Sequence, residues 1–218
     1  GSGMIHPDMA TMLAFFSCDA GVEPSTWKAM VGRAVQRSFN AITVDGDTST
    51  NDTVLAFAAG DVLDSVHHAA LEQGLTEAMQ HLAQSIARDG EGATCLIEVQ
   101  VEGADDEPSA LKVARTICGS SLVKTAVHGR DPNWGRIVAA AGRSGVPFDP
   151  EQVALWIGSH QLMQGGQPLP FDRDGASAVL REPTVQLRLR LGAGPGQGRA
   201  WGCDLSDQYV RINADYTT

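Results

Sequence analysis

The segment TCLIEVQV, residues 94–101, decides the fold of this chain. Apolar and polar residues alternate along it, which is typical of a β-strand that buries one face. The residues before it, from about Asp64 to Arg88, carry apolar side chains on helical spacing, and Asp89 with Gly90 ends the predicted helix. A long helix followed at once by a strand indicates a fold in which helices and strands are mixed.

The same patterns extend to both sides of this segment. Towards the N-terminus the sequence predicts a buried strand at 12–18, a helix from Pro24 to about Arg37, a short strand at 41–44 and an apolar segment at 53–60. Towards the C-terminus it predicts a helix capped by Ser109, a helix starting near Pro132, and β-rich segments at 153–158, 184–191, 199–205 and 209–216.

This order favours an α+β layered fold over a doubly wound parallel sheet. Several of the later strands read as antiparallel hairpins, which a doubly wound sheet would not contain. The connection GADDEPS at 103–109 is acidic and contains proline, so we expect a division there into residues 1–106 and 107–218.

Composition narrows the class of protein. The chain has 218 residues and a net charge of −10, so it repels nucleic acid and anionic membranes, and neither is expected as a partner. Its four cysteines stand singly without a CxxC pair, which favours a reducing cytoplasm. We see neither a signal peptide nor an apolar run that could span a bilayer. The chain does not begin with Met, and we interpret it as a fragment or as one half of a processed precursor.

The segment GSGMIHPDMATMLAFF, residues 1–16, contains a candidate nucleophile in Thr11. A threonine hydroxyl needs a base, and an α-amino group with a pKa of about 7.7–8.0 can be that base if Thr11 is the first residue of a chain. This requires cleavage of the Ala10–Thr11 bond, which the Thr11 hydroxyl could itself begin by attacking the Ala10 carbonyl. By itself Met-Ala-Thr is an ordinary tripeptide. The alternative is therefore that Thr11 has no catalytic function.

Two acidic segments are candidates for binding. Asp45, Asp47 and Asp52 lie in a loop rich in turn-forming residues and could coordinate a cation, although the spacing is not that of an EF-hand and a capped turn is the alternative. Glu91 stands between two glycines that would let a ligand approach the backbone. It could bind a cationic amine, or it could be a solvated loop carboxylate.

Two later segments carry further polar groups. The stretch KTAVHGRDPNWGRI, residues 124–137, could bind an anion at the predicted helix start near Pro132, and His128 is either a general base or a structural histidine. At the C-terminus Asn213 offers an amide and Thr218 carries the terminal carboxylate, with a frayed tail as the alternative.

Taken together and in order, five segments identify a family. GSGMIHPDMATML, SFNAITVDGDTSTND, ARDGEGAT, KTAVHGRDPNWGRI and YVRINADYTT closely resemble the β-chain region of the ornithine acetyltransferase (glutamate N-acetyltransferase) family of arginine biosynthesis. The resemblance covers essentially the whole chain. It implies a precursor that cleaves itself between Ala10 and Thr11, after which Thr11 takes the acetyl group of N-acetylornithine and passes it to glutamate. Some members of the family also accept acetyl-CoA as the donor.

The resemblance also assigns binding residues and partners. It implies that Thr11, Glu91, Asn213 and Thr218 contact the substrate, that no cofactor or metal takes part, and that the partner is the α chain of the same precursor in an α2β2 heterotetramer. The residues that form the oxyanion hole, and a substrate-binding lysine, would lie outside this chain.

The resemblance implies a layered α/β sandwich shared with self-processing aminopeptidases, with a smaller C-terminal α/β domain. One alternative function is therefore a self-processing aminopeptidase of the same fold. The other is a non-catalytic metal- or phosphate-binding module that uses the 45–52 and 128–136 loops.

Overall fold

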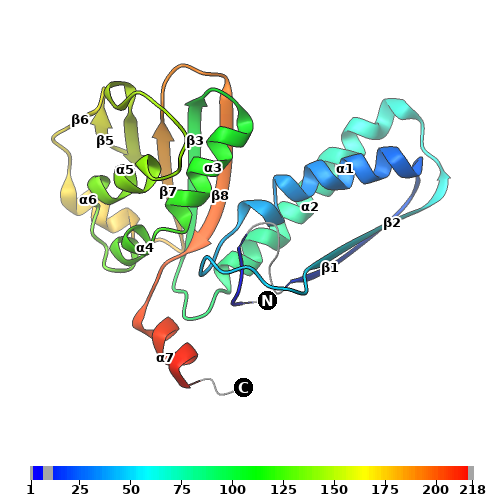
Figure 1. Cartoon of the computed structure of the whole chain (residues 1–218), viewed down its shortest axis with the longest axis horizontal. Coiled ribbons are helices and arrows are strands. Elements are labelled where there is room, and N and C mark those ends of the chain that lie inside the picture. The colour runs from blue at the N-terminus through cyan, green and yellow to red at the C-terminus, as the bar shows by residue number, and fades with distance from the viewer. Residues whose placement is uncertain (1, 7–11, 216–218) are drawn as a thin grey trace.

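The chain builds two sheets of unequal size, each with helices packed on it (Figure 1). This computed structural model describes residues 2–6 and 12–215. The strands of the smaller sheet come first in the chain, within residues 13–62, and the first strand of the larger sheet begins at Leu96.

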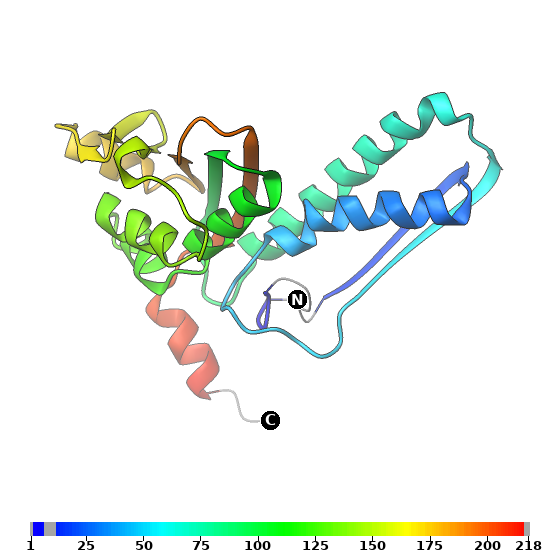
Figure 2. The ribbon, with the colours of Figure 1, turned by 45° about the horizontal axis from the view of Figure 1, so that its top comes forward.

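The smaller sheet is a ribbon of two parallel strands, β1 (Leu13–Gly21) and β2 (Thr53–Val62). Two long helices, α1 (Pro24–Gln36) and α2 (His68–Arg88), run alongside it (Figures 1 and 2). Ala14, Phe16 and Val54 of the ribbon share one apolar cluster with Ala34 and Met79 of the helices. The opposite face of the ribbon is therefore left without a helix. The short 3-10 turns η1 (Phe39–Ala41) and η2 (Ser65–His67) lie in the connections.

The larger sheet has six strands in the order β6-β5-β4-β7-β3-β8. Their bounds are β3 Leu96–Ala104, β4 Ala154–Ile157, β5 His160–Gln164, β6 Gln167–Pro168, β7 Thr184–Arg190 and β8 Gly196–Cys203. β3 pairs in parallel with β7 and antiparallel with β8, so the sheet is mixed.

Four helices accompany this sheet: α3 Glu107–Cys118, α4 Ser121–His128, α5 Trp134–Gly142 and α6 Arg173–Val179. A further 3-10 turn, η3 (Pro150–Gln152), precedes β4. The alternating apolar residues of β3 form the surface on which α3 packs. Val99 and Val101 lie fully buried in the same cluster as Val113 and Ile117. The strand predicted at 94–101 is confirmed and forms the centre of this packing.

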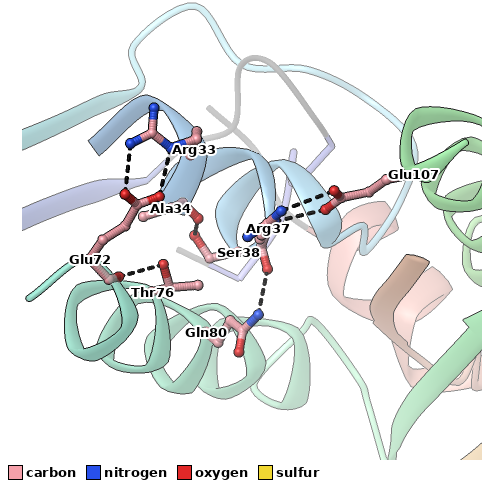
Figure 3. A network of polar contacts seen from close by, with 8 residues as sticks. All are labelled: Arg33, Ala34, Arg37, Ser38, Glu72, Thr76, Gln80 and Glu107. Atoms are coloured by element: carbon pink, nitrogen blue, oxygen red, sulfur yellow. Dashed lines mark hydrogen bonds and ion pairs between the residues drawn. The ribbon is translucent and has the colours of Figure 1, made fainter. Parts of the chain in front are cut away.

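Polar contacts join the end of α1 to α2 and to α3, the helix that packs on the larger sheet (Figure 3). Arg37 makes a bidentate ion pair with Glu107 at the start of α3, with Nε 2.7 Å from Oε1, and Gln80 of α2 donates to the Arg37 carbonyl oxygen at 3.0 Å. Both charged side chains are about half exposed, so this pair contributes roughly 0–1 kcal/mol. The pair links the end of α1 to the start of α3.

Three sequence expectations about individual elements were wrong. Residues 209–216 were expected in a strand, yet Asp207–Asp215 forms a helix, α7, because a short apolar pattern fits either period. Residues 41–44 form no strand, since Ile42 makes only an isolated bridge to Trp201. Asp106 rather than Ser109 caps α3. The helix expected to start near Pro132 is confirmed as α5, with Asn133 as its N-cap.

The division into residues 1–106 and 107–218 stays a prediction. β3 lies before the expected boundary but pairs with the later strands β7 and β8. Most of the apolar cluster around α1 and α2, by contrast, precedes β3. Among the described residues no helix is both long and apolar enough to cross a membrane.

Candidate active site

The loop between α2 and β3 presents Glu91 to the N-terminal segment. The Glu91 backbone N–H donates to the Ser2 carbonyl oxygen at 3.0 Å, which ties the two segments together. Gly3 comes so close that a Cβ at this position would lie 2.5 Å from Glu91 Oε1. A larger residue at this position would have to displace the end of the flexible Glu91 side chain, so Gly3 lets the carboxylate lie against the N-terminal segment.

The C-terminal helix brings Asn213 to the same carboxylate. Asn213 Nδ2 donates to Glu91 Oε2 at 2.8 Å and to the Tyr209 carbonyl oxygen at 3.0 Å. Two residues 122 positions apart, both predicted as substrate contacts, therefore touch each other. Their role in binding stays a prediction. An ionised carboxylate has about four acceptor sites, so Glu91 can accept from a ligand amine as well as from Asn213.

Gly92 lets α7 pack directly on the Glu91 loop. Its φ of 67° is in the left-handed region, and a Cβ there would lie 2.5 Å from the Tyr209 backbone nitrogen. Ser206 Oγ donates to the Gly92 carbonyl oxygen at 2.6 Å. The loop and the start of α7 thus fit together backbone to backbone, which is what places Asn213 beside Glu91.

We expect Gly92→Ala to push α7 away from the loop and to destabilise the protein by roughly 1–3 kcal/mol. The cause is steric, because the Tyr209 backbone cannot move without displacing the helix. Gly74→Ala is the matched control: nothing lies within 4 Å of a Cβ at this helix position, so it should stabilise by roughly 0.5–1 kcal/mol. Denaturant titration of both variants checks this. Equal effects of the two substitutions would contradict the steric account.

In the acidic loop predicted as a cation site, the carboxylates accept hydrogen bonds from backbone N–H groups. The Asp45 carboxylate accepts from the N–H groups of Met4 at 2.7 Å and Ile5 at 3.1 Å. Asp52 Oδ1 accepts from the Met12 N–H at 2.9 Å, and burial raises the pKa of this carboxyl above its ordinary value while that hydrogen bond offsets part of the rise. In the part of the chain that the structure describes, no three His, Cys, Asp or Glu side chains gather in a way that could hold a metal ion.

These contacts lie on both sides of the predicted cleavage point. Ala10, Thr11 and Thr218 themselves lie outside the described residues. Met12, the next residue after Thr11, is held twice, since its carbonyl oxygen also accepts from the Thr53 N–H at 3.0 Å. The sequence prediction for Asp52 was therefore wrong. Its place in a turn-rich loop indicated a metal ligand or a capped turn. Its carboxylate instead holds Met12, which directly follows the predicted nucleophile.

Polar side chains of the 124–137 segment contact other parts of this chain. Asn133 Oδ1 caps α5 by accepting from the Arg136 N–H at 3.1 Å, and Asp131 pairs with Arg173 at 2.9 Å. Asn133 thus satisfies one backbone N–H at the helix start that the sequence suggested for an anion. Lys124 is buried and donates to the Val44 carbonyl oxygen.

His128 lies beside a carboxylate that the sequence did not single out. Its Nδ1 is 2.7 Å from Asp204 Oδ2. Burial alone would raise the pKa of Asp204, but hydrogen bonds from Thr94, His128 and Cys95 outweigh it, so the pKa of this carboxyl lies below its ordinary value. Asp204 is therefore ionised at neutral pH, and its hydrogen bonds hold parts of the fold together. No motif marks it in the sequence, because its partners come from segments more than 70 residues away.

The fold and the site together define a class: layered α/β proteins in which the N-terminal segment, the loop before the central strand and the C-terminal helix meet at one carboxylate–amide pair. The model of the ArgJ family matches residues 1–218, and the chain belongs to that family. This agrees with the family indicated by the five sequence segments.

Relatives and a solved structure give the extent of the likeness. The chain is 88% identical over 218 residues to the arginine biosynthesis bifunctional protein ArgJ of Parasynechococcus marenigrum and 68% identical over 227 residues to that of Prochlorococcus marinus. It is covered completely in both comparisons but spans only 53% of each relative. A crystal structure of the Bacillus halodurans protein of the same name superposes with a TM-score of 0.91 at 43% identity, covering 94% of this chain and 100% of that chain. The expected α+β layered fold class is thereby confirmed.

Proposed function

We propose that this chain is the nucleophile-bearing half of an acetyltransferase that moves an acetyl group from N-acetylornithine to glutamate through an acetyl-Thr11 intermediate. The observation that carries the proposal is the Glu91–Asn213 contact at 2.8 Å, next to the N-terminal segment that leads to Thr11. A carboxylate and an amide at one point suit an amino-acid ligand, which offers an ammonium group and a carboxylate. The name of the relatives, arginine biosynthesis bifunctional protein, supports the substrate class.

The chemistry begins with the Ala10–Thr11 bond. Attack by the Thr11 hydroxyl on the Ala10 carbonyl converts the amide into an ester, and water then releases Thr11 with a free α-amino group. That amine takes the hydroxyl proton when Thr11 attacks the acetyl carbonyl of N-acetylornithine. The tetrahedral intermediate expels ornithine, which leaves with the proton. The α-amine of glutamate then attacks the acetyl-Thr11 ester and regenerates the hydroxyl.

Glu91 and Asn213 bind rather than react. The Glu91 carboxylate attracts the ammonium group of the bound amino acid, and the Asn213 Nδ2 group holds that carboxylate in place, which leaves Asn213 Oδ1 as a further acceptor for the ammonium group. Asp52 keeps the chain after Thr11 fixed through Met12, so that the new N-terminus points consistently. Thr218 would add its terminal carboxylate to the amino-acid site.

The uncovered face of the β1–β2 ribbon supports a partner chain. Leu13, Phe15, Leu55 and Phe57 alternate along the two strands with side chains 41–67% exposed. A two-stranded ribbon is marginal alone and leaves unpaired edges. The curated relatives are about twice as long as this chain, whereas the Bacillus halodurans chain is covered over its full length. We infer that the α chain of the same precursor covers this face, contributes the oxyanion hole and pairs into an α2β2 assembly.

Glu91→Gln tests the proposal, in this chain joined to the remaining half of the Parasynechococcus marenigrum relative. A hydrogen bond to a charged group is worth about 1.5–3 kcal/mol, so we expect kcat/KM for N-acetylornithine to fall roughly 10- to 100-fold. Cleavage at Ala10–Thr11 should continue, because Glu91 takes no part in it. Steady-state kinetics and intact mass measure both quantities.

The control for this variant is Glu77→Gln on α2, where the carboxylate contacts only Gln73 and is exposed. Its kinetics should match those of the parent protein. Unchanged kcat/KM in Glu91→Gln would refute the assignment of Glu91. If the parent protein hydrolyses amides and transfers no acetyl group to glutamate, the aminopeptidase alternative is correct. Substituting acetyl-CoA for N-acetylornithine as the donor in the same assay shows whether it is also used.

A further inference from the structure

Three segments of the chain meet at the Asp204 carboxylate. Oδ1 accepts from the backbone N–H groups of Thr94 at 2.7 Å and Cys95 at 3.1 Å. Oδ2 accepts from Thr94 Oγ1 at 2.6 Å and faces His128 Nδ1 at 2.7 Å. The Asp204 side chain has no exposed surface, whereas that of His128 is 38% exposed. Four donors thus fill the acceptor sites of one buried carboxylate.

This cluster lies at the base of both arms of the proposed substrate site. Thr94 follows Glu91 by three residues, and Asp204 comes shortly before the first residue of α7, Asp207. Asp204 therefore joins the end of the loop that carries Glu91 to the start of the helix that carries Asn213. The Asp204 N–H also reaches the Cys95 carbonyl oxygen at 3.4 Å, so the two backbones are tied in both directions.

Apolar packing does not hold α7 in place. Among its described residues none is buried, and the helix extends away from the larger sheet (Figures 1 and 2). Its position depends on the contacts at its base and on those of Ser206, Tyr209 and Asn213 with the 91–92 loop. We expect a change at the base to reach Asn213, since none of the described residues of the helix is buried and could anchor it.

We propose that His128 and Asp204 form a positioning pair that holds α7 so that Glu91 and Asn213 face the amino-acid substrate together. This inference rests on the proposed function. His128 supplies the donor from the end of α4 and so locks the base of α7 against a third element. In the proposed mechanism neither side chain makes or breaks a bond, so we expect the pair to set substrate affinity and to leave the chemical step and the cleavage at Ala10–Thr11 unchanged.

Substitutions of His128 test the pair without leaving a buried cavity, because this side chain is partly exposed. In the assembly with the remaining half of the relative, His128→Ala removes the donor, while His128→Asn keeps an N–H near the position of Nδ1. We expect KM for glutamate to rise roughly 10-fold in His128→Ala with kcat unchanged, and to stay within about 2-fold in His128→Asn. Asp131→Asn is the matched control, since Asp131 lies in the next loop and pairs with Arg173 on the surface.

A second readout does not depend on activity. Amide hydrogen exchange over residues 207–215 should speed up in His128→Ala and remain as in the parent protein in His128→Asn and Asp131→Asn. An unchanged KM with unchanged exchange in His128→Ala would overturn the proposal, and so would a loss of kcat in proportion to a lowered melting temperature. If the parent protein transfers no acetyl group, the proposed function fails, and faster exchange of α7 in His128→Ala alone still supports the positioning role.

Discussion

Thr11→Ala is expected to leave the precursor uncut and to abolish acetyl transfer. Both steps need the same hydroxyl, first against the Ala10 carbonyl and then against the acetyl donor. Removing the nucleophile of an acyl-transfer enzyme costs roughly 10⁴- to 10⁶-fold in kcat, so the remaining activity should lie at the background of the assay. Gel analysis for cleavage and a steady-state assay with N-acetylornithine and glutamate measure the two losses.

Thr11→Ser is the control for this prediction. It keeps a hydroxyl and, after cleavage, a free α-amino group, so both processing and transfer should persist at reduced rates. The parent protein incubated with N-acetylornithine alone should gain the mass of one acetyl group on the fragment that begins with Thr11, and Thr11→Ala should not. Cleavage or full activity in Thr11→Ala would show that another group is the nucleophile.

The order of the two reactions matters for this prediction. An uncut Thr11 has its nitrogen in an amide, which cannot act as a base at neutral pH, so transfer has to follow cleavage. Asp52 and Asp45 hold the backbone on either side of the junction through Met12, Met4 and Ile5, which keeps both pieces in place after the bond is broken. A cut protein therefore retains the arrangement that surrounds its new N-terminus.

Much of the fold could be predicted from periodicity. The β3 strand and the α2 helix are long and regular, and their sequence patterns fixed their positions to within a few residues. The α7 helix could not be predicted in this way, because nine residues with no buried face satisfy a strand pattern equally well. The pattern of apolar residues alone therefore does not decide between the two structures.

The candidate site shows a similar limit. The Glu91 loop was noticed because glycines flank the acid, and the structure adds a reason for one of them: a Cβ at Gly92 would collide with the backbone of α7. Asp204 could not be found, because a single acid after a strand is an ordinary feature of a sequence. Its importance arises from donors in two distant segments, 76 and 110 positions away.

The largest loss of stability is expected from Trp201→Ala. The Trp201 side chain is fully buried on β8 and belongs to the apolar cluster that also contains Met79 and Ala87 of α2. It therefore joins the larger sheet to the helices of the smaller one. Truncation of a buried tryptophan costs about 3–5 kcal/mol, through lost apolar burial and the cavity left behind. For a chain of this size the melting temperature should fall by roughly 10 °C.

Trp201→Phe separates packing from hydrogen bonding in this prediction. The Trp201 Nε1–H donates to Glu98 Oε2 at 2.8 Å, and the Glu98 side chain is only 16% exposed. Phenylalanine retains much of the ring packing but loses this donor, so we expect a smaller cost of about 1–3 kcal/mol. Denaturant midpoints measured at one fixed protein concentration compare the variants, because association with a partner chain would also raise stability. If the two substitutions cost the same, the hydrogen bond to Glu98 rather than apolar contact with α2 holds the two halves together.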